Sequence, residues 1–519
     1  MARQQMAVAA MAMILGTGCV QRIDRKTGPT LQTVDLGAPF LKAHMRNGDL
    51  YVLSAWRIDE ATRTISGTGE LQGPERQDVA ERVHRVHIDD VALFETNTVV
   101  TSPGVAALAV VTGISVAVTV ACLTNPKACF GSCPTFYAVA DDGRTVLQAE
   151  GFSDAISPSL ERNDVDALWH TTGRGGRATV RMTNEAYETH VVKQADLLAV
   201  RRPPGGRVIA TEDRLWLATA VHAPRACTGP EGSCLDRLRA IDSDERTSLT
   251  DAHDLAARET IELEFAPLPM GAPAAAPGAG PAAGIVIASR QSLVTTFLIY
   301  QGLAYLGTTA GTWLAALERG VLGAQGSGRA LQQLVGSIEV QVERAGAWHT
   351  IGETSETGPL ATDVHLVPLP AGVLRADAPT RIRLVLPQGG WRIDHVGLAT
   401  LAGEAQPTRI APTRIRGTLG AEYGKGRVAA TRFPIVTLPG DAYDFEYVLP
   451  PGDDHELFLD SRGYYLEWMR REWMREERPA AALQMLVNPA QALRDLAPLY
   501  KQHEPTAEAQ FWGSRYAHP

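Results

Sequence analysis

The stretch GRATVRMTNEAYETHVVKQADLLAV, residues 176–200, decides the fold class of this chain. Valine, threonine and other residues that favour strands recur through it, and turn residues bound it at Gly173–Gly176 and Pro203–Gly206. Runs of this composition between glycine- or proline-rich turns are typical of β-strands. The stretch therefore predicts strands.

The same signal returns on both sides of this stretch. Upstream, DLYVLSAWRID (49–59) alternates apolar and polar residues, which is the period of a half-buried strand. Downstream, SIEVQVERAGAWHTIGE (337–353) alternates too, and TRIRLVLPQGGWRIDHVGLATL (380–401) indicates two strands joined at Pro387–Gly390. Short strands at this spacing are typical of a β-sandwich or jelly-roll. We expect a mainly β, multidomain protein with such units, one long apolar helix and a helical C-terminal tail.

Two apolar segments interrupt the β pattern. Residues 104–123, GVAALAVVTGISVAVTVACL, carry no charge, and as a helix they would be about 30 Å long, the thickness of a bilayer core. Small residues suit close packing within a membrane and equally suit a helix under protein. A membrane span and a helix that lies in the membrane surface or under protein both stay open. Residues 292–320 are also strongly apolar and helix-like.

The tail switches to a helical period. In YYLEWMRREWM (464–474), Tyr465 and Trp468 fall on one helical face, and Pro479 and Pro489 further on predict breaks between short helices. The full length of 519 residues is too great for one ordinary core. The predicted segments are a signal peptide (1–18), a tether (19–34), a small β unit (35–98), an apolar helix (99–126), a cysteine-containing β domain (127–265), a Pro/Ala/Gly linker (266–284), an apolar helix plus sandwich (285–452) and a helical tail (453–519).

The first nineteen residues, MARQQMAVAAMAMILGTGC, have the layout of a secretory signal. Arg3 precedes an apolar stretch, and small residues lead to Cys19. This cysteine resembles the lipidation site of a bacterial lipoprotein, although Gly16 stands where leucine is usual. A chance cysteine in an Ala/Met-rich helix is the alternative. The pattern predicts a protein of the bacterial cell envelope, anchored by lipidated Cys19 and facing the periplasm or the cell surface.

The charge of the chain excludes one class of partner. Lysine and arginine number 49 against 58 aspartates and glutamates, the net charge is −9, and no Lys/Arg-rich cluster occurs. A protein that holds a phosphate backbone needs a concentrated positive face, so nucleic-acid binding is not expected. The expected partners are the membrane, through the lipid anchor and through 104–123, and an unidentified envelope protein or glycan.

Five cysteines follow the lipidation site, and an odd number leaves at least one outside any intramolecular disulfide. We expect structural disulfides among them. Cys227 and Cys234 bracket the turn-rich TGPEGS, while Cys129 could pair with Cys133 or Cys122. Three residues separate Cys129 from Cys133, whereas a redox motif has two. A zinc site made of the last four cysteines is a weaker alternative, because their spacings of three and six are wider than zinc prefers.

The predictions of lipidation, of a membrane crossing and of disulfides constrain one another, because each implies a compartment for part of the chain. A lipidated Cys19 would place residues 20–98 outside the cytoplasm, and one crossing at 104–123 would then place the later cysteines in the reducing cytoplasm. Lipidation, a single crossing and downstream disulfides therefore cannot all be true.

The sequence contains no recognisable catalytic set. His84 and His87 lie three apart in HRVH and would face opposite sides of a strand. Asp394 and His395 are adjacent in WRIDHV and, by the same alternation, cannot face one way. No GxGxxG, P-loop, HExxH or EF-hand motif occurs. We therefore predict no catalytic residue, no metal site and no cofactor.

From Ser132 onward the chain resembles a group of uncharacterised bacterial envelope proteins. In that group an apolar segment is followed by Ser-Cys-Pro, a tyrosine, Asp-Gly, an AI.P.LER.D run and an NE..ET pair. The resemblance ends near residue 200 and implies an envelope setting but no activity. The stretch AVADDGRTV carries one extra turn residue compared with the group. The matching residues are Ser132-Cys133-Pro134, Tyr137, Asp142-Gly143, Ala155-Ile156, Pro158, Leu160-Glu161-Arg162, Asp164, Asn184-Glu185 and Glu188-Thr189.

Three functions remain open at this point. The leading expectation is a non-enzymatic envelope lipoprotein that acts as a binding or scaffold protein. The first alternative is an envelope hydrolase or carbohydrate-active enzyme on the sandwich at 334–449, with Asp394 and His395 required for turnover. The second alternative is a membrane-assembly component that spans the bilayer at 104–123.

Overall fold

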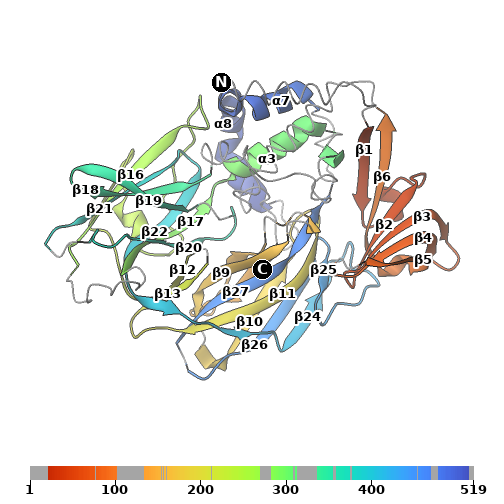
Figure 1. Ribbon diagram of the computed structural model, residues 1–519, viewed down its shortest axis with the longest axis horizontal. Coiled ribbons are helices and arrows are strands. Elements are labelled where there is room, and N and C mark those ends of the chain that lie inside the picture. Colours follow the sequence, from red (N-terminus) through yellow and green to blue (C-terminus); the bar gives the residue numbers. More distant parts are fainter. Residues whose placement is uncertain are drawn as a thin grey trace. The chain divides into compact units, whose positions relative to one another are not determined.

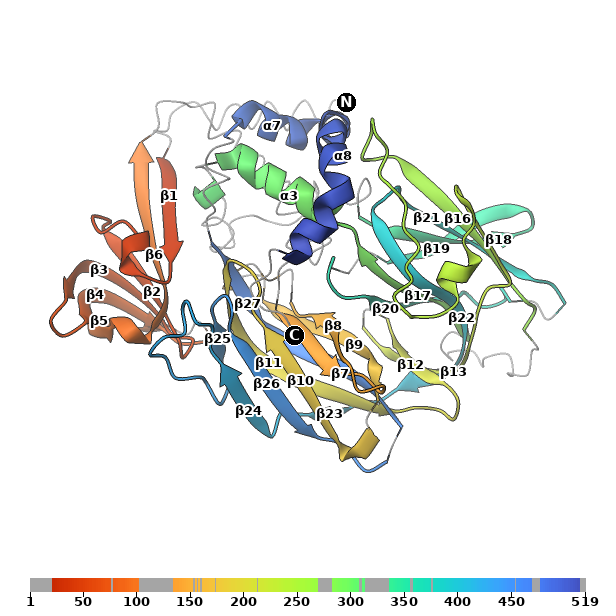
Figure 2. The same ribbon diagram turned by 180° about the vertical axis from the view of Figure 1, so that it is seen from behind.

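The structure is a computed structural model, and its described part is mainly β (Figures 1 and 2). The described residues are 21–101, 134–268, 282–312, 336–468 and 477–513, apart from 76–77, 153–154, 156, 159–160, 173, 212, 308–309, 355–357, 375–376, 453. They form two compact units. Unit 1 holds 21–101, 299–312, 467–468 and 477–492, and unit 2 holds 134–298, 336–466 and 493–513.

Unit 1 is built on one antiparallel sheet with the order β1-β6-β2-β3-β4-β5. Its core gathers Leu41, Leu53, Ile65 and Phe94, all nearly inaccessible to solvent. The alternation of apolar and polar residues places these side chains on one face. The strands are β1 Gln21–Gly28, β2 Phe40–Met45, β3 Leu50–Asp59, β4 Thr64–Gln72, β5 Asp78–His87 and β6 Val91–Thr101.

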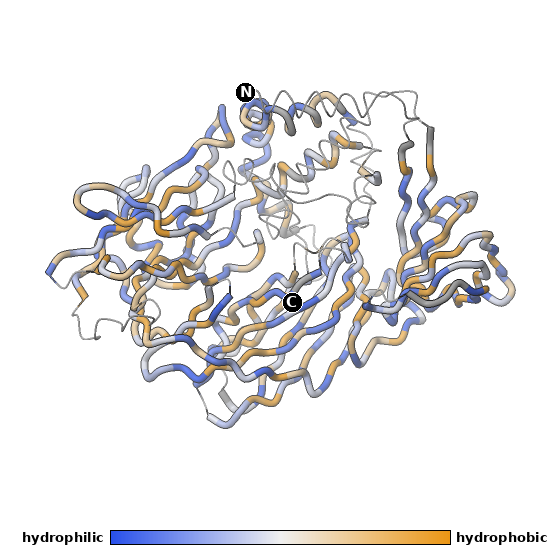
Figure 3. The backbone as a smooth tube through the Cα atoms, viewed as in Figure 1, coloured by the Kyte–Doolittle hydropathy of each residue, from blue (hydrophilic) through white to orange (hydrophobic). Residues whose placement is uncertain are grey.

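Unit 2 contains a closed five-stranded barrel and three further sheets. The barrel runs β12-β13-β22-β17-β20, and the β21 sheet runs β15-β14-β16-β21-β18-β19. The β26 sheet runs β24-β26-β10-β7-β8, and the β27 sheet runs β23-β11-β27-β9 with β25 on β11. In Figure 3, apolar and polar residues alternate along many of these strands.

Their bounds follow the turn signals of the sequence. The barrel strands are β12 Arg207–Ala210, β13 Leu215–His222, β17 Ala283–Gln291, β20 Asp363–Pro368 and β22 Trp391–Ala405. The β21 sheet has β14 Ala226–Gly229, β15 Gly232–Ser233, β16 Arg258–Phe265, β18 Ile338–Arg344, β19 Ala347–Thr354 and β21 Thr380–Pro387. The β26 sheet has β7 Thr135–Val139, β8 Thr145–Glu150, β10 Arg177–Thr183, β24 Arg414–Thr418 and β26 Ala442–Val448. The β27 sheet has β9 Arg162–Thr172, β11 Glu188–Arg201, β23 Thr408–Ile410, β25 Ile435–Thr437 and β27 His455–Glu467.

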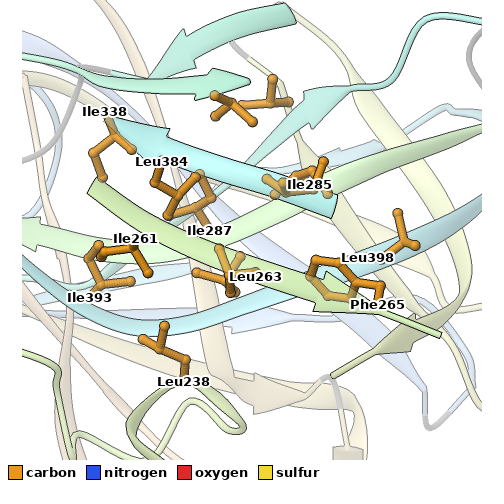
Figure 4. Close-up of a cluster of buried hydrophobic side chains, with 14 of the residues drawn as sticks. Leu238, Ile261, Leu263, Phe265, Ile285, Ile287, Ile338, Leu384, Ile393 and Leu398 are labelled. Atoms are coloured by element: carbon orange, nitrogen blue, oxygen red, sulfur yellow. The ribbon is translucent and has the colours of Figure 1, made fainter. Parts of the chain in front are cut away.

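The largest described core of unit 2 lies between the barrel and the β21 sheet (Figure 4). Ile261 and Leu263 from β16 meet Ile285 and Ile287 from β17, and Leu384 from β21 lies among them. Strands from before and after the predicted linker thus pack on one another. They also pair directly, because β16 pairs with β21 and β10 pairs with β26. The linker at 266–284 therefore does not divide the β strands into two independent domains.

The C-terminal part corrects the predicted helical tail. Residues His455–Glu467 form β27, a central strand of its sheet, instead of the start of a helix. Tyr464 and Tyr465 are both buried, so both faces of the strand are covered and no helical stripe forms. The next helices in the described part of the chain come after residue 478. The helices α7 Pro479–Val487 and α8 Pro489–Gly513 each begin at a predicted proline break.

The predicted apolar helices have different outcomes. Residues 292–320 contain α3 Leu293–Leu306, followed by Gly307 with φ of 54°, a backbone conformation that favours glycine. The stretch 104–123 lies outside the described residues, and β6 extends to Thr101 where the helix had been predicted from residue 99. In the described part of the chain, no helix is both long and apolar enough to cross a bilayer.

Candidate functional site

The disulfide between Cys227 and Cys234 confirms one sequence prediction. Cys227 lies on β14, Cys234 directly precedes the short 3-10 helix Leu235–Leu238, and both are buried in the core beneath the β21 sheet. Because the two sulfur atoms are bonded to each other, neither is a thiolate that could ligate zinc. Cys19, Cys122, Cys129 and Cys133 lie outside the described residues. Among described residues, no group of three or more His, Cys, Asp or Glu is placed to hold a metal.

Replacing both cysteines with alanine is expected to lower the free energy of unfolding. The bond joins residues seven apart, and closing a loop of this size in the unfolded chain is worth about 2–3 kcal/mol. Urea unfolding of C227A/C234A beside the wild type under oxidising conditions measures the loss. Equal stability of the two proteins would contradict the expectation.

Asp394 and His395 meet at a β-bulge in the barrel. Along the pairing of β22 with β17, Ala288 faces His395 and Ser289 faces Ile393, so Asp394 is the extra residue. A bulge re-aims side chains and breaks strict alternation. The prediction that the two side chains cannot face one way was therefore wrong, because both reach the same segment, Leu238–Ser243.

The partners of this pair are backbone groups. The Asp394 carboxylate accepts hydrogen bonds from the Ser243 N–H at 3.0 and 3.1 Å and from the Asp242 N–H at 3.4 Å. Burial raises the pKa of Asp394 to about 6, the two N–H groups oppose this shift, and the Glu245 carboxylate adds to it. Burial lowers the pKa of His395, against the carbonyl groups of Leu238 and Arg239. The exposed fractions of Asp394 and His395 are 1% and 7%, so a substrate would reach them only if this segment moved.

We call residues 238–254 the cover loop, because they lie over this pair and are fixed by α8. The Arg290 guanidinium donates to the Glu245 carboxylate at 2.6 and 2.7 Å. On α8, Glu508 pairs with Arg290 at 3.4 Å and with Arg392 at 3.1 Å. These four charged side chains join the cover loop, β17, β22 and α8. A network of ion pairs, rather than one contact, therefore holds the cover loop over Asp394 and His395.

The same helix binds both backbone polar groups of one residue of the cover loop, Thr250. Glu504 accepts the N–H of Thr250 at 2.7 Å, and Lys501 donates to its carbonyl oxygen at 2.5 Å. Lys501 and Glu504 also pair with each other at 2.6 Å. Charge-assisted bonds of this kind are stronger than neutral ones. The cover loop and α8 should therefore open together.

Replacing Glu504 with alanine is expected to speed amide exchange in the cover loop. The variant leaves the Thr250 N–H without its acceptor. Losing a hydrogen bond to a charged group is expected to raise the rate of amide exchange in the loop roughly 10- to 100-fold. Hydrogen exchange of peptides covering Asp242 and Ser243 measures it. Glu404→Ala is the control, because Glu404 belongs to an exposed pair with Arg214. Unchanged exchange in the Glu504 variant would show that α8 does not hold the loop.

Residues that carry the envelope-protein resemblance meet in the β26 and β27 sheets. Tyr137 donates to Glu185 at 2.9 Å, and Glu188 contacts the His190 ring at 2.6 Å with both side chains fully buried. Asn184 donates to the Glu188 carbonyl oxygen at 3.0 Å. These polar atoms of β7, β11 and the turn before β11 bind one another, so in the described structure they organise the fold. The histidines of HRVH are separate from this group, on β5 of unit 1.

Sequence inspection missed two buried carboxylates. Glu456 accepts two hydrogen bonds from each of Arg202 and Arg207, and Arg207 stacks on Trp169 at 3.3 Å. The partners lie 254 and 249 residues away, and no local spacing announces such a pair. In unit 1, burial opposes the ionisation of Glu95. Three basic side chains outweigh it and hold the pKa of Glu95 well below its usual value: Arg25, Lys42 and His44.

Comparison with known proteins does not assign the chain to a family. No protein-family model matches the chain, and no curated protein matches it.

Proposed function

We propose that the protein is a non-enzymatic lipoprotein of the bacterial cell envelope that binds or scaffolds another envelope protein or a glycan. The observation that carries this proposal is the buried Cys227–Cys234 disulfide. Disulfides persist in oxidising compartments such as the periplasm and are rare in the cytosol. Together with the secretory layout that ends at Cys19, the bond supports export followed by lipid anchoring.

The polar clusters support binding or scaffolding over catalysis. Asp394 is bound by backbone N–H groups, and Glu456 is bound by two arginines. A catalytic carboxylate has to contact its substrate, whereas these carboxylates contact the chain itself and lie under cover. The hydrolase alternative would need the cover loop to release Asp394 and His395.

The intact mass of protein extracted from membranes, measured with and without reductant, tests the proposal. We expect a chain that begins at Cys19, carries acyl groups on that residue, and gains two hydrogens for each disulfide on reduction. An unmodified Cys19 or fully reduced cysteines in the native protein would overturn it. So would turnover of an envelope glycan or peptide by the purified full chain that is lost in His395→Gln while the variant stays folded.

A further inference from the structure

The Cys227–Cys234 bond closes a small hairpin at the edge of the β21 sheet. The hairpin consists of β14 and β15, which pair with each other at two positions of the register. A pair of such short strands is barely stable on its own in water. On its other side β14 pairs with β16, whereas β15 is the end strand of the sheet. The disulfide is therefore a main fastening of β15 to the sheet.

The cover loop starts where this hairpin ends. Cys234 directly precedes the 3-10 helix Leu235–Leu238, and the cover loop begins at the last residue of that helix. The Leu238 side chain is buried in the large core of unit 2, which also contains both cysteines (Figure 4). The carbonyl groups of Leu238 and Arg239 face the His395 ring. The disulfide thus fixes the chain just ahead of the groups that contact His395.

The tip of the hairpin holds the cover loop a second time, at Arg246. The Glu231 carboxylate accepts two hydrogen bonds from the Arg246 guanidinium, at 2.7 and 2.9 Å. The same guanidinium is 2% exposed and also binds Glu259, at 2.7 and 3.1 Å. The Arg246 backbone exchanges two hydrogen bonds with Ile393, at 2.7 and 3.1 Å. The hairpin is therefore fastened to the loop beside the residue that precedes Asp394.

The stretch between these two fastenings is the part of the loop that covers Asp394 and His395. It turns at Ser243, whose φ of 69° lies in the left-handed region that residues other than glycine rarely adopt. The Asp394 carboxylate binds the Ser243 N–H and so stabilises the turn. A backbone held in such a conformation persists only while its surroundings impose it. Release of the hairpin is therefore expected to open this stretch.

We propose that formation of the Cys227–Cys234 bond closes the cover loop over Asp394 and His395, and that the chain with two free thiols leaves this pair accessible. The reaction is a thiol–disulfide exchange with a disulfide-containing oxidant. The two cysteine thiols give up two electrons and two protons as their sulfur–sulfur bond forms, and the disulfide of the oxidant becomes two thiols. The inference goes beyond the proposed function and holds whether or not Cys19 is acylated. The bond thus decides whether Asp394 and His395 can contact a ligand.

Two measurements on the full chain test the inference. The first is hydrogen exchange of peptides covering 239–246, and the second is modification of His395 by diethyl pyrocarbonate, which reacts with accessible imidazole rings. The samples are the oxidised wild type, the wild type reduced with dithiothreitol, C227A/C234A and Glu456→Ala. Glu456→Ala keeps the bond but breaks a buried set of ion pairs, so it controls for general destabilisation. The exposed His349 reports how active the reagent is in every sample.

Both forms without the bond are expected to exchange the amides of 239–246 roughly tenfold faster or more than the oxidised wild type, because hydrogen bonds to charged groups are lost there. The reaction of His395 with the reagent should rise in the same two forms. Glu456→Ala should match the wild type in both measurements. Glu231→Ala keeps the bond but removes the contact with Arg246, and it should speed exchange of the same peptides by a smaller factor.

Equal exchange with and without the bond would overturn the inference. An equal rise in Glu456→Ala would overturn it as well, because general loosening of unit 2 would then explain the effect. Loss of protection throughout unit 2 in both forms without the bond would also count against it, since the disulfide would then hold the whole unit together instead of the cover loop.

Discussion

Replacing Glu456 with alanine is expected to lower the free energy of unfolding of unit 2 by about 3–5 kcal/mol. The carboxylate is 1% exposed and accepts bonds of 2.7–3.0 Å from two arginines. It also accepts the Val208 N–H at 3.2 Å. Removing it leaves Arg202 and Arg207 close together without their shared counter-charge. Breaking a buried pair from one side costs far more than a surface pair contributes.

Urea unfolding at neutral pH measures this effect, and Asp444→Ala supplies the matched control. Asp444 accepts two bonds from Arg181 with similar geometry, but the two side chains are 30% and 44% exposed. The control is expected to change the unfolding free energy by less than about 1 kcal/mol. If the Glu456 variant lost no more than the control, the cluster would contribute little to stability.

Replacing Asp394 with asparagine is expected to change how stability depends on pH. The folded-state pKa of Asp394 is raised from 3.8 to about 6, so the native protein binds this proton more tightly than the unfolded chain does. Between about pH 4 and pH 6, the Asp394 contribution to stability therefore falls as pH rises. The whole shift corresponds to about 3 kcal/mol, since one pKa unit is about 1.4 kcal/mol, and about 2 kcal/mol of it falls within that window.

The measurement compares the variant with the wild type at pH 4, 5, 6 and 7 by urea unfolding. The stability of Asp394→Asn relative to the wild type should rise by about 2.5 kcal/mol from pH 4 to pH 7. His395 titrates nearby with a lowered pKa, and its contribution cancels in this difference if its surroundings are unchanged. Asp142→Asn should give an almost flat difference between pH 4 and pH 7, because the Arg144 N–H and guanidinium lower the pKa of Asp142 and its contribution therefore changes below that range. Parallel curves for the wild type and Asp394→Asn would contradict the burial argument.

Local patterns were sufficient for much of the fold. Alternation and turn residues predicted strands in 49–59, 337–353 and 380–401, where the structure has β3, β18 with β19, and β21 with β22. The pair Cys227–Cys234 could also be predicted, because the turn between the two cysteines brings them together without help from the rest of the chain. These features depend on residues that are neighbours in sequence.

The failures share a cause in long-range packing. Tyr465 and Trp468 are three apart and fit a helical face, but Tyr465 lies on β27, where its neighbour Tyr464 is buried too, so both faces of the strand are covered in the folded chain. A short apolar run has no period that separates a buried strand from a helix. The meeting of Asp394 with His395 depends on one extra residue against β17, and no local signal marks that bulge.

The pairing of β10 with β26 has a consequence for the order of folding. Arg181 on β10 and Asp444 on β26 are partners across 263 residues of chain. In its sheet β26 lies between β24 and β10, so during synthesis this sheet cannot be completed until most of the chain has emerged. Contacts between residues so far apart in the sequence form slowly. A nascent chain that cannot close its sheets early stays unfolded for longer and exposes strand edges to aggregation.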